Sequence, residues 1–250
     1  MLDVSLRLAT TLNRLASGRT NAPDAEQVVR GDGTPHHVVD PDGLLGLDPL
    51  RAVPLRLALA RLEHGRLGSP NPTEGATPVW ALLLPRPGRP AGLRGPADFT
   101  RAALECESVV LTHDGTLAWL GERVGGGVQW RLARADRPLP PPDPRECARQ
   151  FSRTVAQAAS VLSELDLAVG ARPGEVHAPV LGEGYPSRSQ TLLDRAWLVL
   201  LAVDAALASQ HEVLHSHAVL TRERHLRELA DAALDAISAA TSWPEWVLEV

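Results

Sequence analysis

The chain contains no lysine, and all 25 of its basic residues are arginine. A protein without lysine cannot form a lysine Schiff base with a carbonyl substrate or with pyridoxal phosphate. It also lacks the phosphate-binding lysine of a Walker A loop and the ATP-binding lysine of a protein kinase. These enzyme classes are therefore excluded. Arginine has GC-rich codons and lysine does not, so the bias reflects a GC-rich genome rather than a function.

Long hydrophobic runs are also missing. The most apolar stretch covers residues 196–203 between Arg195 and Asp204, whereas a membrane-spanning helix needs about 20 apolar residues. The first residues carry Asp3 and no basic cluster ahead of an apolar run, unlike a secretory signal. We therefore expect a cytoplasmic protein with no membrane partner.

Cysteine is scarce, with only Cys106 and Cys147 in the chain. Their spacing matches neither a C-x-x-C motif nor a zinc ribbon. We expect two reduced, partly buried thiols.

The remaining composition is that of a globular protein. The chain has 250 residues, of which 44% are hydrophobic and 22% charged, enough for one large domain or two small ones. A net charge of −5 argues against nucleic acid as a partner. Residues 84–153 carry more arginine than acid and residues 154–250 more acid than arginine, so the two parts could attract each other or the acidic part could meet a basic partner.

The first third predicts two helices and a long connection. Leucine and alanine at helical spacing predict a helix over 2–17 that ends at Gly18. Residues 19–48 resemble a loop, in which Val28-Val29 and Val38-Val39 could form a hairpin around a Gly-Asp-Gly turn. A second helix is predicted from Pro49 to His64, followed by a proline-rich linker over 69–78.

The middle third predicts a mixed unit with the order β-α-β-β-β. Its expected elements are a strand over 79–84, a helix over 97–105, and strands over 109–112, 117–120 and 128–132. The last three strands should pair as an antiparallel meander. Period-two alternation predicts that Val128, Trp130 and Leu132 face the core while Gln129 and Arg131 face water or a partner.

The last third predicts three helices, over 145–168, 188–208 and 217–240. Asp143, Pro144 and Glu146 form a capping box at the start of the first helix. The second helix is so apolar that we expect it to be central in the core, with Leu200 buried. The fold class is therefore α+β: a small, mainly antiparallel sheet with N-terminal helices and a C-terminal three-helix bundle. We expect three parts, 1–69, 78–138 and 143–250, in one compact domain.

Several short segments resemble one family. They are Trp80–Pro85, Leu93–Phe99, Glu107–Val110 and Gly184–Arg188, the last of which opens a long helix. Together they are similar to a family of conserved actinobacterial proteins that has no assigned activity, over about residues 78–240. The resemblance implies an actinobacterial source and no particular chemistry.

One motif carries possible chemistry. His211, Glu212 and His215 form an H-E-x-x-H sequence, which on a helix places two imidazoles to bind zinc and the Glu as general base. Glu223, His225 and Glu228 are the nearby candidates for a third ligand. The motif falls where one helix should end and the next begin, and the third histidine of the metzincins is absent. A metal site at His211 and His215, with zinc as the possible cofactor, is therefore a hypothesis beside that of a chance histidine cluster.

A second candidate is the loop that carries Arg86, Arg89 and Arg94 among glycines. Guanidinium groups and free loop amides both suit phosphate, so the loop could bind an anion or a nucleotide. No catalytic motif in the sequence is more specific than a chance match. Our first hypothesis is therefore a non-enzymatic interaction or accessory protein with a protein partner, for which an oligomer is also possible. The alternatives are a zinc metallopeptidase and an anion-binding module.

Overall fold

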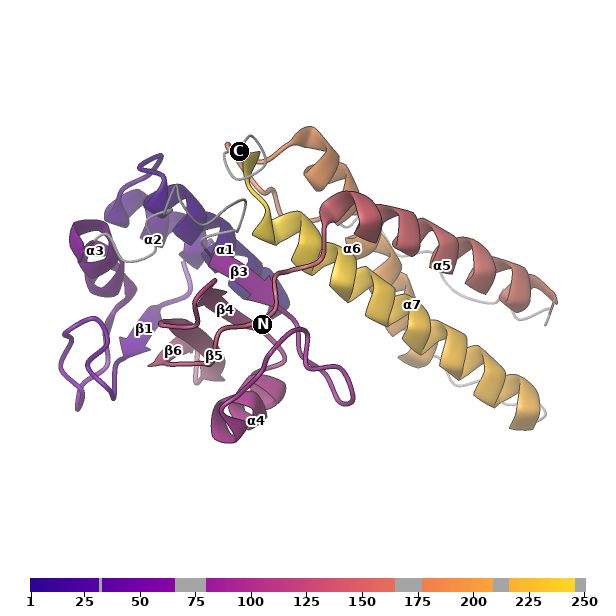
Figure 1. Cartoon of the computed structure of the whole chain (residues 1–250), viewed down its shortest axis with the longest axis horizontal. Coiled ribbons are helices and arrows are strands. Elements are labelled where there is room, and N and C mark those ends of the chain that lie inside the picture. The colour runs from indigo at the N-terminus through magenta and orange to yellow at the C-terminus, as the bar shows by residue number, and fades with distance from the viewer. Residues whose placement is uncertain (32, 66–79, 165–176, 209–215, 246–250) are drawn as a thin grey trace. The chain divides into compact units, whose positions relative to one another are not determined.

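The computed structural model describes residues 1–31, 33–65, 80–164, 177–208 and 216–245. The chain forms two compact units, and Figure 1 labels most of their helices and strands. Unit 1 contains residues 1–141, 181–186 and 241–250, and unit 2 contains residues 142–180 and 187–240. The predicted linker over 69–78 lies outside the described residues.

Unit 1 is built on a six-stranded sheet with the order β2-β1-β6-β5-β4-β3. Neighbouring strands are antiparallel except for β1 and β6, which are parallel. The predicted α+β class is confirmed, with a mixed sheet that is mainly antiparallel. The strands are β1 His36–Val39, β2 Val53–Pro54, β3 Trp80–Leu83, β4 Val109–Thr112, β5 Ala118–Val124 and β6 Gly127–Ala133.

The predicted hairpin before residue 40 is wrong, because residues 22–30 form helix α2 (Ala22–Arg30). The Asn21 side chain accepts a hydrogen bond from the backbone N–H of Asp24, and Pro23 lies in the first turn, as at many helix starts. Ala25 and Val29 are then buried one turn apart. Val38 pairs instead with Trp130 of β6.

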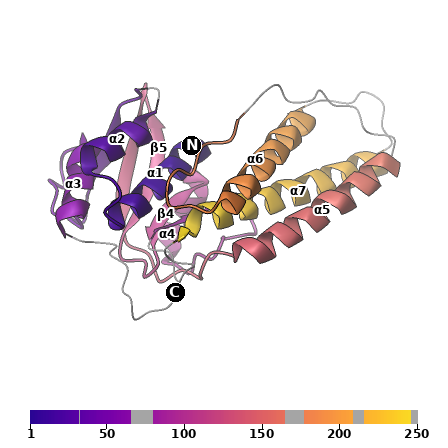
Figure 2. The same cartoon turned by 90° about the horizontal axis from the view of Figure 1, so that it is seen from above.

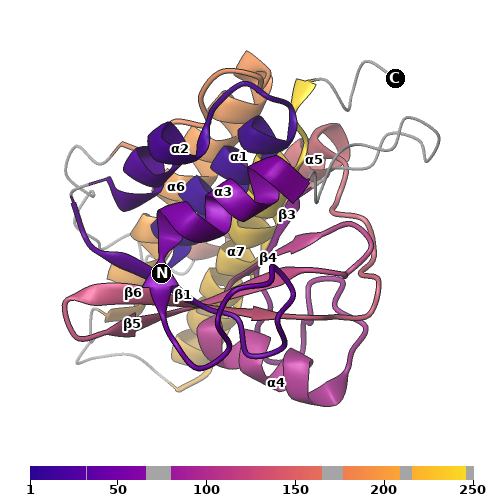
Figure 3. The same cartoon turned by 90° about the vertical axis from the view of Figure 1, so that its left-hand side faces the viewer.

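Helices cover both faces of the sheet. Figure 3 shows α1 (Leu2–Ala16), α2 and α3 (Leu55–Gly65) on one side and α4 (Ala97–Cys106) on the other. Helix α1 ends before Gly18, whose φ of +70° suits glycine, as the sequence predicted. Helix α3 begins later than predicted because Val53 and Pro54 pair with β1 and the residue before a proline favours extended backbone.

The alternation in β6 is confirmed. Val128, Trp130 and Leu132 are buried, Arg131 is exposed and Gln129 is half-buried. A separate cluster packs Phe99 and Ala103 of α4 against the opposite face of the sheet. Both faces therefore carry apolar cores.

Unit 2 consists of three helices that run side by side (Figure 2): α5 (Pro144–Glu164), α6 (Ser187–Ala208) and α7 (Ser216–Ser242). The predicted cap is confirmed, since Asp143 Oδ1 accepts hydrogen bonds from the backbone N–H groups of Arg145 and Glu146 at 2.9 Å each. The core contains Ala158, Val203, Leu226 and Leu229. No described helix is long and apolar enough to span a membrane.

Helix α6 is less central in the core than expected, because only one stripe of it is buried. Leu193, Ala196 and Val203 are buried, but Leu200 is half-buried and Leu198 is 47% exposed. Only one stripe of the helix, with buried residues three or four positions apart, packs into the core. The apolar residues on either side of that stripe are in contact with solvent. Leu200 is thus half-buried and not buried as predicted.

Candidate functional site

The H-E-x-x-H motif lies outside the described residues, so the structure does not place His211, Glu212 or His215. Of the nearby candidates, His225 is buried and its Nδ1 lies 3.0 Å from Glu228 Oε2. Its other ring nitrogen, Nε2, lies 3.5 Å from a guanidinium nitrogen of Arg224. Both nitrogens thus have protein neighbours. Among the described residues, no three His, Cys, Asp or Glu side chains could together hold a metal ion.

The arginine loop has a defined backbone. Arg86 and Arg89 exchange two backbone hydrogen bonds of 2.9 and 2.8 Å around a tight turn. Arg86 is half-buried and donates a side-chain hydrogen bond to the backbone oxygen of Leu84, whereas Arg89 and Arg94 are exposed. The Arg86 guanidinium is therefore directed partly toward its own backbone.

Both cysteines are free thiols, as predicted. Cys106 borders a pocket of about 400 Å³ between the end of α4 and strand β5. Burial raises the pKa of the Cys106 thiol, and the Arg131 guanidinium only partly opposes this effect. The thiol is protonated at neutral pH, which disfavours a role as a nucleophile.

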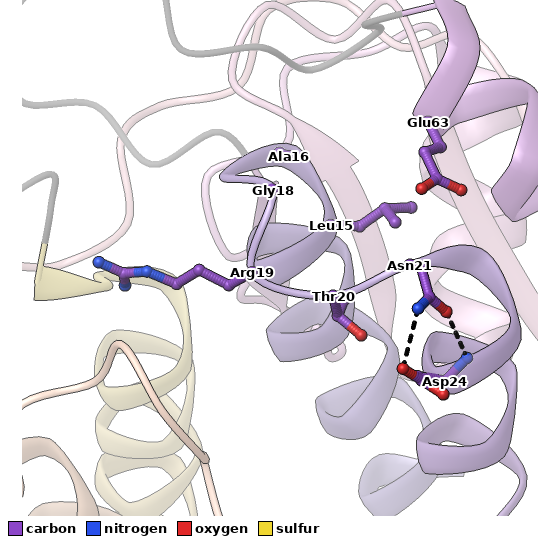
Figure 4. Close-up of a pocket in the computed structure, with 8 residues that line it drawn as sticks. All are labelled: Leu15, Ala16, Gly18, Arg19, Thr20, Asn21, Asp24 and Glu63. Carbon is purple, nitrogen blue, oxygen red and sulfur yellow. Dashed lines mark hydrogen bonds between the residues drawn. The ribbon is translucent and has the colours of Figure 1, made fainter.

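A second pocket, of about 560 Å³, opens at the turn between α1 and α2 (Figure 4). Glu63 of α3 accepts a hydrogen bond from the backbone N–H of Ala22 at 3.2 Å. Asn21 and Asp24 bond to each other, and Arg19 points away from them in Figure 4. The amide groups at the start of α2 are thus occupied by the protein itself, and the carboxylates of Asp24 and Glu63 disfavour an anion.

A buried polar network joins distant parts of unit 1. The Asn13 side chain of α1 forms two hydrogen bonds with the backbone of Trp80: Nδ2 donates to the carbonyl oxygen at 2.9 Å, and Oδ1 accepts from the N–H at 3.0 Å. The amide group therefore occupies the place of a neighbouring strand at the edge of β3. Ser242 does the same for Leu82, since its hydroxyl accepts from the Leu82 N–H at 3.1 Å.

Tyr185 extends this network to the segment 181–186. Its hydroxyl accepts a hydrogen bond from Asn13 Nδ2 at 3.1 Å and donates one to the backbone oxygen of Thr241 at 2.8 Å. A backbone hydrogen bond from Glu245 to Gly184 adds a further link. The Tyr185 hydroxyl thus acts as both acceptor and donor. These hydrogen bonds fix residues 181–184 against the end of α1.

Arg14 follows Asn13 and has no comparable partner among the described residues. Its Nε is sealed from solvent and donates to no acceptor, although a buried donor without an acceptor is rare in folded proteins. Its Nη1 lies 3.6 Å from the position that a Cβ of Gly182 would take. The guanidinium therefore lies against the loop that Tyr185 anchors.

Sequence reasoning missed this arrangement. Neither Arg14 nor residues 181–183 were among the candidate site residues predicted from the sequence. The two glycines Gly182 and Gly184 before a helix were the available signal. They became informative only when the fold brought them beside Arg14.

These features define a protein with an α+β unit of six strands and a separate three-helix unit. The chain matches the model of the Rv1486c-like protein, N-terminal domain, over residues 5–146, and that of the Rv1486c-like protein, C-terminal domain, over residues 145–238. It therefore belongs to the Rv1486c-like family. No curated protein and no solved structure gives a match. The two family descriptions name no activity.

Proposed function

We propose that the protein is a non-enzymatic interaction protein that binds a protein partner through one end of its helical unit. The observation that supports this is a group of exposed aliphatic side chains, the tip patch, where α6 ends and α7 begins. Leu207 is 40% exposed, Val219 39% and Leu220 65%. A hydrogen bond of 2.6 Å from Arg222 Nη2 to the backbone oxygen of Ala206 brings these two helix ends together.

Single exposed aliphatic residues are common, but a group of them at one place is typical of a protein-binding surface. The tip patch has no core role, because the core of unit 2 is formed by another stripe that contains Val203 and Leu226. The half-exposed flank of α6 with Leu198 adds apolar surface to the same helix. A partner that covers the tip patch would remove this apolar area from water.

The test is site-specific photocrosslinking in the native cell. A photoreactive residue at position 220 should give one defined protein adduct, and the Leu207→Ser variant of that chain should reduce its yield severalfold. The matched control is position 50 in unit 1, because Leu50 is 92% exposed but lies outside the tip patch. Adducts at position 220 that do not exceed those at position 50 would contradict the proposal. Light scattering of the purified chain then distinguishes a second copy from a different protein.

The two alternatives rank lower. The zinc peptidase depends on His211, Glu212 and His215, which lie outside the described residues. The anion-binding module depends on Arg86, Arg89 and Arg94, of which Arg86 already donates to the carbonyl of Leu84.

A further inference from the structure

The guanidinium of Arg14 is the one charged group of α1 that has a buried donor without an acceptor. Arginine carries five N–H donors and keeps its charge at all accessible pH values. Nε is sealed, and among the described residues no carboxylate lies within ion-pair distance of the group. Arg7 on the same helix, in contrast, is paired with Asp3. The described residues thus leave Nε of Arg14 without an acceptor.

The loop beside Arg14 also has unused donors. Gly182 and Gly184 have φ values of +84° and +91° on either side of Glu183. In the described part of the chain, the backbone N–H groups of these three residues donate to no acceptor. Successive backbone N–H groups can together donate to an anion.

Gly182 brings the loop next to Arg14, and its positive φ favours glycine at this position. A Cβ there would stand 3.6 Å from Arg14 Nη1, on a backbone that side chains rarely adopt. Tyr185 then holds the loop in place through Asn13 and Thr241. The Tyr185 hydroxyl accepts one hydrogen bond and donates another, so it holds the loop in position. The guanidinium of Arg14 stays available to a ligand.

We propose that Arg14 and the loop Gly182–Gly184 bind a small oxyanion, which is a phosphate or a carboxylate group. Both present paired oxygens that match the planar fork of a guanidinium. Arg14 is only half-buried as a whole, so its Nη atoms can be reached from outside while Nε stays sealed. The exposed carboxylate of Glu183, between the two glycines, opposes anion binding.

The experiment compares the full chain with Arg14→Met, which keeps an unbranched apolar stem and removes the donors. Calorimetric titration with inorganic phosphate should give saturable binding, and Arg14→Met should weaken it at least tenfold. Titration with acetate in parallel separates the sources: a tenfold preference for phosphate indicates a phosphate ligand, and equal or tighter acetate binding a carboxylate ligand. The matched control is Arg19→Met, an exposed arginine five residues on, which should bind as the parent does.

Thermal unfolding supplies a second readout. Phosphate should raise the Tm of the parent more than that of Arg14→Met, since only bound ligand adds to the general salt effect. Equal shifts in both proteins, or binding that survives Arg14→Met, would overturn the proposal. Glu183→Gln keeps the fold because the side chain is exposed, and it should strengthen phosphate binding. Weaker or absent phosphate binding in Glu183→Gln would also count against the site.

Discussion

Gly121 of β5 lies directly opposite Trp130 of β6, and the indole ring fills the space that a side chain at position 121 would need. A Cβ at position 121 would stand 2.6 Å from Cζ3 of Trp130 and 2.8 Å from Cε of Met1. The ring cannot easily move, because it packs edge-on against Trp119 and its N–H donates to His36 Nδ1 at 3.3 Å. Glycine at this position is therefore a packing requirement.

Gly121→Ala should lower the free energy of unfolding by about 1–3 kcal/mol through overpacking. Chemical denaturation followed by tryptophan fluorescence measures the change. Gly126→Ala is the matched control, because nothing lies within 4 Å of the added Cβ and no positive φ opposes it. Its effect should stay within about 0.5 kcal/mol. Equal stability of the two variants would show that the ring of Trp130 gives way.

Tyr185 is the chain's single tyrosine, so tyrosinate absorbance during an alkaline titration reports this residue alone. Burial raises the pKa of Tyr185 well above its ordinary value, with only partial opposition from Asn13 and Arg14. The folded state therefore disfavours the ionised form. The stabilising effect is complete below about pH 10, the ordinary pKa, and is lost as the pH rises above it.

We expect tyrosinate to form only together with unfolding, as seen by circular dichroism. Tyrosinate that forms near pH 10 with native circular dichroism would contradict the buried network. Tyr185→Phe should abolish the absorbance change. Because it leaves the carbonyl of Thr241 without its donor, it should also cost about 1–3 kcal/mol.

A charge in the core of unit 2 should have a much larger effect than one on its surface. Val203 is 2% exposed and packs with Ala158 and Leu226, whereas Leu198 of the same helix is 47% exposed. Val203→Asp should destabilise by about 3–5 kcal/mol, and Leu198→Asp by less than about 1 kcal/mol. The native thiol of Cys147 provides the measurement. Burial and the neighbouring carboxylates of Asp235, Asp143 and Glu146 raise its pKa to about 12.

Cys147 should therefore react with a thiol reagent only when unit 2 opens. Val203→Asp should accelerate its labelling strongly and Leu198→Asp only slightly. Similar labelling rates in both variants would show that the assignment of the core stripe of α6 is wrong.

The H-E-x-x-H motif should not hold a catalytic zinc. A zinc peptidase needs a third protein ligand and an open position for water, and both ring nitrogens of His225, the nearest candidate, already have protein neighbours. Purified protein should contain much less than one zinc per chain, and Glu212→Gln should leave its properties unchanged. One tightly held zinc that is lost in His211→Ala together with a hydrolytic activity would establish the alternative.

Much of the local structure could be predicted because its causes lie within a few residues. The Asp143 side chain caps amides two and three positions away, so the start of α5 was readable. The alternation of Val128, Trp130 and Leu132 predicted a buried strand because side chains point to opposite faces in turn. The apolar composition of α6 predicted a helix but not which stripe of it is covered.

Long-range contacts between strands and side chains could not be predicted from the sequence, because they depend on atoms that are distant in it. Nothing near Val38 indicates that it pairs with Trp130. Helix α2, in contrast, has a local cap at Asn21 that the hairpin prediction overlooked. The bonds between Asn13 and Trp80 join groups 67 residues apart.

Helix ends and strand alternation were thus determined by the sequence alone, through neighbouring hydrogen bonds and side-chain periodicity. Only the tertiary structure decided that Arg14 lies beside Gly182 with its Nε unsatisfied. The physical reason is that periodicity records which side of an element is apolar, whereas a binding site depends on which polar groups lack a partner after every element has packed.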